Sequence, residues 1–129
     1  MEHYVDQLAE LGLVVIEKTD YITAKKDELY VDLRFHNGVF DHVQWYADKI
    51  FDYDEFLRRY ANYTAYVAEC KRYLAARGFI QVITPYTLGG VRVSFDAVNV
   101  YIKKLDTGAV YSFTIGDANF KIQLDTLMS

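Results

Sequence analysis

Apolar residues recur at steps of three and four positions along one long stretch of the chain, between Asp52 and Gly78. Asp52 followed three residues later by Glu55 is typical of a capping box, and Gly78 can end a helix in the left-handed conformation. The pattern predicts a helix over 53–77, about 37 Å long. Its apolar arc is broad, so we expect the helix to be the core scaffold, covered from more than one side. The inward stripe comprises Phe56, Tyr60, Tyr63, Val67, Cys70 and Leu74.

The pattern before this helix predicts a shorter helix and a strand. Residues 2–11 have helical periodicity and end at Gly12. Consecutive apolar residues in 13–19 predict a strand covered on both faces. The polar stretch 19–28 is expected to be a loop.

Residues 28–46 alternate around Asn37-Gly38, which is the strongest short-range signal for a hairpin with a type I′ turn. Counting outward from a two-residue loop places four pairs opposite each other: Phe35 and Phe40, Arg34 and Asp41, Leu33 and His42, and Tyr30 and Trp45. One face of the hairpin then carries the core residues Leu29, Val31, Leu33 and Phe35. The other face carries Tyr30, Asp32, Arg34, Asp41, Val43 and Trp45.

The chain after the long helix is predicted to be an antiparallel meander over 79–127. Residues 79–84 form a strand, and 91–104 form a long strand with a bulge or bend around Asp96–Val98, where the apolar parity switches. Asp106-Thr107-Gly108 fits a three-residue hairpin loop. Gly116-Asp117 fits a type II′ turn that leads into a last strand over 119–127.

These elements predict an α+β fold with antiparallel-rich sheets packed around one long central helix. LAELGLVVIEKT (8–19) and LAARGFIQVITP (74–85) both end a helix at glycine and continue into a strand. This similarity indicates either a degenerate repeat of a helix–strand–hairpin unit or a common way of ending helices. We expect a single domain over 1–129, with a first unit over 2–46. The order of elements loosely resembles bacterial chaperone-like α+β domains, and function does not follow from order alone.

Composition and charge narrow the function classes. Of the 129 residues, 52% are apolar and 16% aromatic, which excludes a disordered chain. The net charge of −4 gives no footprint for double-stranded nucleic acid. One cysteine cannot form an internal disulfide, and the chain begins without a basic region followed by an apolar core. With no apolar run long enough to span a bilayer, we expect a cytoplasmic protein.

No set of residues has the spacing of a catalytic or metal site. Cys70 lies on the inward stripe of the long helix and is expected to be buried and inert. The histidines lack metal-ligand spacing, and Arg34 between Asp32 and Asp41 favours a structural charge cluster over acid–base catalysis. We therefore expect no enzyme activity, no metal and no cofactor.

Two surfaces are candidates for binding. The first is the hairpin face with Tyr30, Arg34, Asp41, Val43 and Trp45, because aromatic and arginine residues are frequent interface anchors. The second is one flank of the long helix, with the residue types of a platform for single-stranded nucleic acid. Its members are Arg59, Tyr66, Tyr73 and Arg77.

The leading hypothesis is a non-catalytic protein-binding module, of the kind found in small phage or mobile-element inhibitors that bind a host protein. The alternatives are an adaptor like a secretion chaperone, and a binder of small ligands or single-stranded nucleic acid. We also expect a homodimer, because the predicted last strand over 119–127 would lie at a sheet edge with few guarding charges and no proline, and because the Tyr30/Trp45 patch could contact itself in a symmetric dimer. The alternative is that this strand completes a sheet with 13–18 of the same chain.

Overall fold

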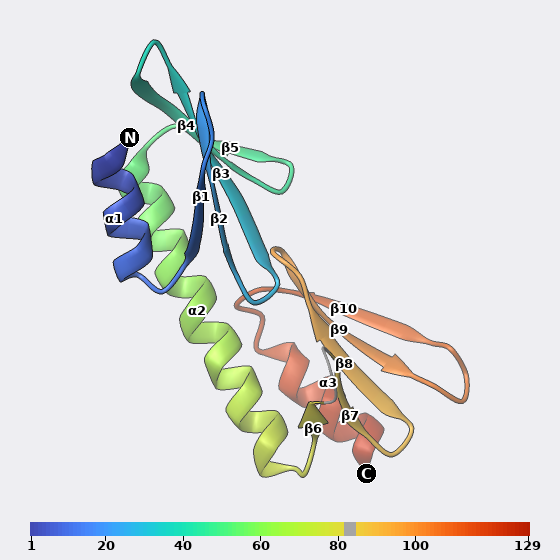
Figure 1. Cartoon of the computed structure of the whole chain (residues 1–129). Helices are drawn as coiled ribbons and strands as arrows, with labels where there is room; N and C mark the ends of the chain where they lie inside the picture. The colour runs from blue at the N-terminus through green and yellow to red at the C-terminus, as the bar shows by residue number, and fades with distance from the viewer. Residues whose placement is uncertain (82–84) are drawn as a thin grey trace. The chain divides into compact units, whose positions relative to one another are not determined.

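The computed structural model describes residues 1–81 and 85–129 and confirms the α+β fold (Figure 1). The helices are α1 (Glu2–Glu10), α2 (Tyr53–Ala76) and α3 (Asn119–Met128). The strands are β1 (Val14–Glu17), β2 (Tyr21–Lys26), β3 (Leu29–His36), β4 (Val39–Trp45), β5 (Asp48–Ile50), β6 (Ile80–Gln81), β7 (Tyr86–Leu88), β8 (Val91–Phe95), β9 (Asn99–Lys104) and β10 (Val110–Thr114). The predicted strand over 79–84 is present at Ile80–Gln81, and the rest of it, 82–84, lies outside the described residues.

The chain divides into two compact units, Met1–Arg59 and Tyr60–Ser129. Within the described residues each unit contains a five-stranded antiparallel sheet whose strands are neighbours in chain order, β1 to β5 in the first unit and β6 to β10 in the second. The expectation of a single domain over 1–129 is not tested by this division and stays a prediction.

In the first unit, α1 and the start of α2 cover one face of the sheet. Tyr4 of α1 contacts the rings of Phe35, Phe40 and Tyr53, and Trp45 contacts Phe56 of α2 edge-on at 6.1 Å between ring centroids. The buried side chains of this unit include Leu8, Ile22, Leu29, Val31, Leu33, Val43, Trp45 and Phe56.

In the second unit, α3 and the rest of α2 contribute to the core. The predicted inward stripe of the long helix is confirmed, since all six of its residues are buried, Phe56 in the first unit and the other five in the second. Phe120 and Leu124 of α3 are buried as well, and Phe120 contacts Phe113 of β10 edge-on at 6.4 Å. The sheet contributes Val91, Val93, Phe95, Val100 and Ile102.

The ends of the long helix follow from its sequence. The Asp52 carboxylate accepts the N–H of Asp54 at 3.1 Å, which satisfies one of the free amides at the helix start. Gly78 ends the helix at φ +90°, and the Phe79 N–H donates to the Leu74 carbonyl at 3.1 Å. The same bond closes α1, where the Leu13 N–H donates to the Leu8 carbonyl at 3.1 Å. The two helix ends therefore have the same geometry, and each leads into a five-stranded meander.

The first sheet differs from the prediction at β2. Residues 19–28 were expected to be a loop, but Tyr21–Lys26 form an interior strand with Ile22, Thr23 and Ala24 buried. The polar residues of this segment, lysines and threonine, favoured a loop in the prediction. Pairing with β1 on one side and β3 on the other stabilises the strand in spite of this composition. The strand β1, expected to be covered on both faces, lies at the sheet edge with Val14 and Ile16 exposed.

The hairpin of β3 and β4 contains an irregularity that the residue count missed. Phe35 pairs with Phe40 as predicted, but the pairing shifts between Arg34 and Phe35. The predicted pairs Arg34–Asp41, Leu33–His42 and Tyr30–Trp45 are therefore wrong. The observed pairs are Arg34–His42, Leu33–Val43, Asp32–Gln44 and Val31–Trp45.

The expected long strand over 91–104 is a hairpin of β8 and β9. The Asp96 carboxylate accepts the N–H of Val98 at 2.8 Å and that of Asn99 at 2.7 Å, and it accepts the Tyr101 hydroxyl at 2.6 Å. These bonds stabilise a turn that contains neither glycine nor proline, so the parity switch marks a reversal of the chain rather than a bulge. The predicted loop at Asp106–Gly108 does connect β9 and β10.

The predicted last strand over 119–127 is wrong, because these residues form α3. The Asp117 carboxylate accepts the N–H of Asn119 at 2.9 Å and so supports the start of the helix. Phe120 and Leu124 are buried four positions apart, while Ile122 between them is 64% exposed. Phe120, Ile122 and Leu124 alternate with polar residues, a pattern that fits a strand as well as a helix. This ambiguity explains why a strand was predicted here. No helix in the described part of the chain is long and apolar enough to cross a membrane.

Candidate functional site

The face of the first sheet that is turned away from α1 forms the candidate site, and we call it the outer face. Its side chains alternate with the buried ones, and the strand register aligns them in rows across the sheet. One row contains Thr23, Asp32, Gln44 and Lys49, and the next contains Tyr21, Arg34 and His42.

Hydrogen bonds hold the centre of the outer face in place. Asp32 accepts the Thr23 hydroxyl at 2.8 Å through one oxygen and the Arg34 guanidinium at 3.2 Å through the other. The Arg34 guanidinium also lies over the Tyr21 ring, 4.1 Å from its centroid. Arg34 is thus fixed between a carboxylate and an aromatic ring while part of it remains accessible, which lowers the entropy lost when it binds a partner.

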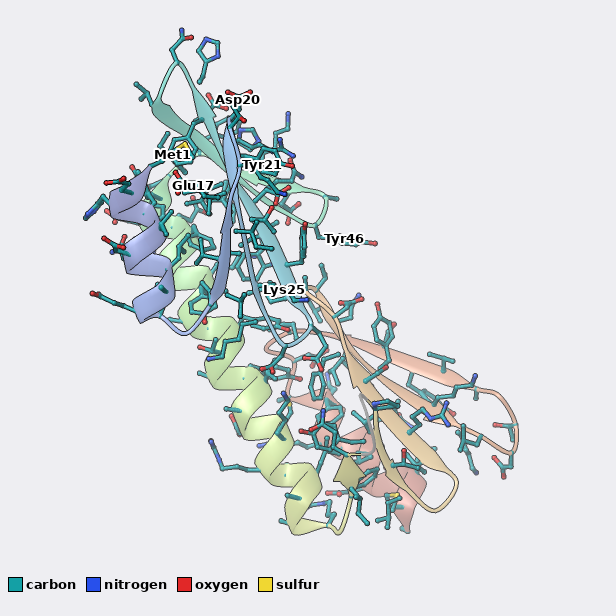
Figure 2. The ribbon with its side chains drawn as sticks, in the orientation of Figure 1. Met1, Glu17, Asp20, Tyr21, Lys25 and Tyr46 are labelled. Carbon is teal, nitrogen blue, oxygen red and sulfur yellow. The ribbon has the colours of Figure 1, made fainter. Side chains whose placement is uncertain are left out.

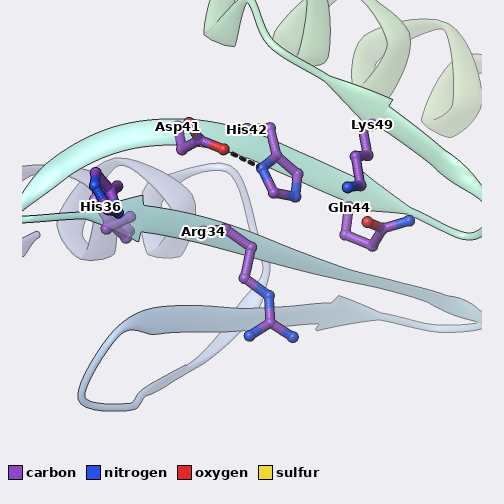
Figure 3. A pocket seen from close by; sticks show the side chains of 7 residues that line it. Arg34, His36, Asp41, His42, Gln44 and Lys49 are labelled. Atoms are coloured by element: carbon purple, nitrogen blue, oxygen red, sulfur yellow. Dashed lines mark hydrogen bonds and ion pairs between the residues drawn. The ribbon is translucent and has the colours of Figure 1, made fainter.

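A shallow concavity of about 390 Å³ opens beside Arg34 (Figure 3). Its polar lining includes a carboxylate–imidazole pair, with Asp41 Oδ2 2.6 Å from His42 Nδ1. Gln44 and Lys49 add further hydrogen-bond donors. The lining residues are Arg34, Phe35, His36, Asp41, His42, Gln44 and Lys49.

The lining of the concavity does not complete a nucleophilic site. The Asp41–His42 pair has the geometry in which a carboxylate orients a histidine base. A covalent mechanism of the serine or cysteine hydrolase type also needs a hydroxyl or thiol within reach of the imidazole, and none of the seven lining residues is serine, threonine, cysteine or tyrosine. Among the residues that the structure describes, no group of three or more His, Cys, Asp or Glu could hold a metal ion.

The structure separates the five residues of the first predicted surface. Tyr30, Arg34 and Asp41 are accessible, with Tyr30 57% exposed. Val43 and Trp45 lie in the core, Trp45 at 1% exposure, because the register shift after Arg34 moves them to the opposite face. Trp45 contacts Phe56 of α2, and burying its indole together with the Val43 side chain stabilises the fold.

Two exposed aromatic residues were missed by the sequence reasoning. Tyr46, in the turn between β4 and β5, is 71% exposed and projects away from the sheet (Figure 2). Phe51 is exposed after β5, and its ring lies 5.6 Å from that of His42. Tyr46 and Phe51 flank β5, and a strand of three residues is too short to be detected from periodicity. Tyr46 therefore adds aromatic surface at the end of the sheet near Tyr30, and Phe51 adds it beside His42.

The second predicted surface, the helix flank, is largely engaged in contacts within the chain. In the second unit, the Tyr66 hydroxyl donates to the Asp117 carbonyl at 2.8 Å, and burial raises the pKa of Tyr66 above its ordinary range. The Tyr73 hydroxyl donates to Asp125, and Arg77 Nε donates to the same carboxylate at 2.9 Å.

The remaining contacts of this flank involve its aromatic face and its fourth member. The Arg77 guanidinium lies 3.2 Å from the centroid of the Tyr73 ring, on the surface that a nucleobase would need for stacking. Arg59 belongs to the first unit, where it pairs with Asp48 at 3.0 Å and lies over the Trp45 ring. These contacts fix the positions of α3 and β5 within their own units.

Cys70 lies in the core of the second unit. It is 1% exposed, and burial raises the pKa of its thiol to about 11, although a hydrogen bond with Tyr66 acts in the opposite direction. At neutral pH the thiol is therefore protonated and shielded from reagents.

Comparisons with known proteins identified no relative of this chain. No protein-family model, no curated protein and no solved structure matches the chain.

Proposed function

We propose that the chain is a non-catalytic protein-binding module and that the outer face of the first sheet contacts the partner. The observation that carries the proposal is the combination of exposed Tyr30 with Arg34, which is held in place by Asp32 and Tyr21 on the same face. Tyrosine and arginine dominate binding energy at protein interfaces, and residues that are ordered before binding lose less entropy.

The electrostatics of this face favour a protein over a polyanion. Arg34 and Lys49 lie beside Asp32 and Asp41, so positive and negative groups alternate across a few residues. A nucleic-acid surface concentrates positive charge, whereas protein interfaces match charges of both signs. The partner surface would therefore carry a carboxylate for Arg34, with apolar groups for Tyr30 and Tyr46.

The finer proposal is a small inhibitor of the phage or mobile-element type that acts in the cytoplasm by covering a host protein. Two features support it: a preformed face on a small unit, and a single cysteine that is buried as a thiol. An inhibitor of this kind works by occlusion and requires complementarity rather than chemistry.

The proposal is tested by affinity capture with matched arginine variants. Arg34→Ala removes the anchor, and Arg92→Ala removes an exposed arginine of β8 in the second unit. We expect wild type and Arg92→Ala to capture the same protein from a lysate of the source cells. Arg34→Ala should bind that protein about tenfold or more weakly, as expected for an interface hot spot.

Equal binding of the partner by both variants would place the interface elsewhere. Loss of binding only in Arg92→Ala would assign the partner to the second unit and overturn the assignment of the outer face. A partner with an enzyme activity that falls on binding supports the inhibitor, and an unchanged activity with a longer-lived complex supports an adaptor.

A further inference from the structure

The last strand of the second sheet, β10, has a free edge. It pairs with β9 on one side, and no strand in the described part of the chain pairs with the other side. The Lys104 N–H donates to the Ala109 carbonyl at 2.9 Å, and the Ile115 N–H donates to the Val98 carbonyl at 2.9 Å. Bonded pairs alternate along an antiparallel ladder, so odd-numbered residues of β10 bond to β9. The backbone groups of Val110, Ser112 and Thr114 therefore point outward.

This edge lacks the features that normally block strand addition. Natural edges are guarded by charges, prolines, bulges or short length. Residues 107–116 contain no charged residue and no proline, and β10 consists of β-branched, aromatic and hydroxyl residues. By contrast, the edge strands of the first sheet carry charged residues: β1 ends in Glu17, and β5 contains Asp48 and Lys49.

We propose that β10 pairs antiparallel with β10 of a second copy of this chain. A twofold axis at Ser112 brings Ser112 opposite its symmetry mate and Val110 opposite Thr114 of the copy. All three outward-pointing residues then form bonded pairs. The Thr114 carbonyl already accepts the Asp117 N–H at 2.9 Å, and its second lone pair can accept the bond from the copy.

The side chains of β10 fit this pairing on both faces of the sheet. Val110, Ser112 and Thr114 are exposed on the face away from α3, so small side chains meet small ones. Tyr111 lies opposite Phe113 of the copy on the other face, where non-bonded pairs bring side chains closest. Each chain carries a net charge of −4, so a second copy is repelled at most surfaces, but no charge lies in this segment to repel it.

A charge-pair experiment on the full chain tests this interface. Ser112→Lys and Ser112→Asp each place like-charged side chains directly opposite each other across the proposed axis, on Cα atoms about 5.5 Å apart, which disfavours the homodimer. Mixing the two variants places opposite charges across the axis. Ser94→Lys is the matched control, because Ser94 is exposed in the same cross-strand row but lies on β8, away from the edge.

Sedimentation velocity from micromolar to millimolar concentration reads out the result. We expect wild type and Ser94→Lys to sediment as dimers, at twice the 15.0 kDa chain mass, and each Ser112 variant alone as a monomer. The one-to-one mixture should recover the dimer. A monomeric wild type at all concentrations, or a Ser112→Lys dimer as stable as wild type, would overturn the proposal.

Amide exchange provides a second measurement that does not depend on the variants. In wild type, the amides of Ser112 and Thr114 should become protected as concentration rises, while those of Tyr111 and Phe113 are protected throughout. If the protection of Ser112 does not depend on concentration, the edge is not an interface between copies. Protection of Ser112 only after an unrelated extended peptide is added would assign the edge to a different partner.

Discussion

A single irregularity between Arg34 and Phe35 decides which side chains of the first sheet face water. Because side chains alternate along a strand, a shift of one residue moves every later residue to the opposite face. The shift places Val43 and Trp45 in the core and leaves Tyr30 and Arg34 outside. Turn type can be derived from Asn37-Gly38, and the bulge is marked in the sequence only by a switch of apolar parity between Phe40 and Val43, which the count from the turn did not use.

The assignment of faces predicts a large loss of stability for one aromatic substitution and almost none for another. Trp45→Ala leaves a cavity against Phe56 and should lower the free energy of unfolding by about 3–5 kcal/mol. Tyr30→Ala, at an exposed position, should change it by less than about 0.5 kcal/mol. Denaturant unfolding measures both. Similar values for the two variants would mean that Trp45 is not in the core.

The buried thiol predicts a particular response to pH. The ordinary pKa of the Cys70 thiol is 9.0, and burial raises it to about 11 in the folded chain. The folded state therefore holds this proton more tightly than the unfolded state, and stability should fall as the pH rises from 9 towards 11. Cys70→Ala should remove this part of the pH dependence, measured by denaturant unfolding at pH values from neutral up to that range. A decline of the same size in the variant would assign the effect to other groups.

At the scale of elements, the two glycine-terminated helices show where sequence reasoning succeeds. Gly78 occupies φ +90°, a conformation that strains residues with a Cβ. Local signals of this kind predicted both helix ends, the Asn37-Gly38 turn and the Asp106–Gly108 loop. They failed at β2, at the Asp96 turn and at α3, where side-chain hydrogen bonds or tertiary pairing decide between alternatives that composition leaves equal.

Substitution of these glycines tests the importance of the helix ends. Gly78→Ala should lower the free energy of unfolding by about 1–2 kcal/mol, because the left-handed conformation places Cβ too close to the following carbonyl. Gly90→Ala is the matched control, since Gly90 does not have a positive φ and a methyl group there would meet no atom within 4 Å. The control should be neutral or slightly stabilising. Equal losses in both variants would show that the helix end contributes nothing specific.

At the scale of the whole molecule, the chain uses one plan twice: a helix that ends at glycine, followed by a five-stranded antiparallel meander in chain order. The similarity of residues 8–13 and 74–79 in sequence is matched by the same hydrogen bond at each helix end. The glycine-terminated helix followed by a strand was predictable in both halves because it depends on local signals, whereas the five strands of each sheet were not, since β2, β5 and the β8–β9 reversal were missed. The two surfaces proposed for binding, the outer face and the β10 edge, were not predictable. The first depends on the register of β4, and the second depends on residues 119–127 forming α3 instead of a further strand.

The two proposals place different partners on different units. The outer face of the first sheet is assigned to a protein of another kind, and the β10 edge of the second sheet is assigned to a second copy. The expectation of a homodimer from the sequence depended on an edge strand at 119–127, which is a helix, and on a Tyr30/Trp45 patch, of which Trp45 is buried; the proposed interface depends on β10 instead. A Ser112→Lys monomer that still captures the partner would show that the two interfaces are independent.

Site-specific photo-crosslinking tests the central claim, that the outer face binds the partner, most directly. A photoreactive phenylalanine analogue replaces Tyr30 on the outer face in one variant and exposed Ile122 on α3 in another. After irradiation with the captured partner, we expect a covalent adduct of the two chains from position 30 and none from position 122. An adduct from position 122 alone, or equal adducts from both positions, would contradict the assignment of the outer face.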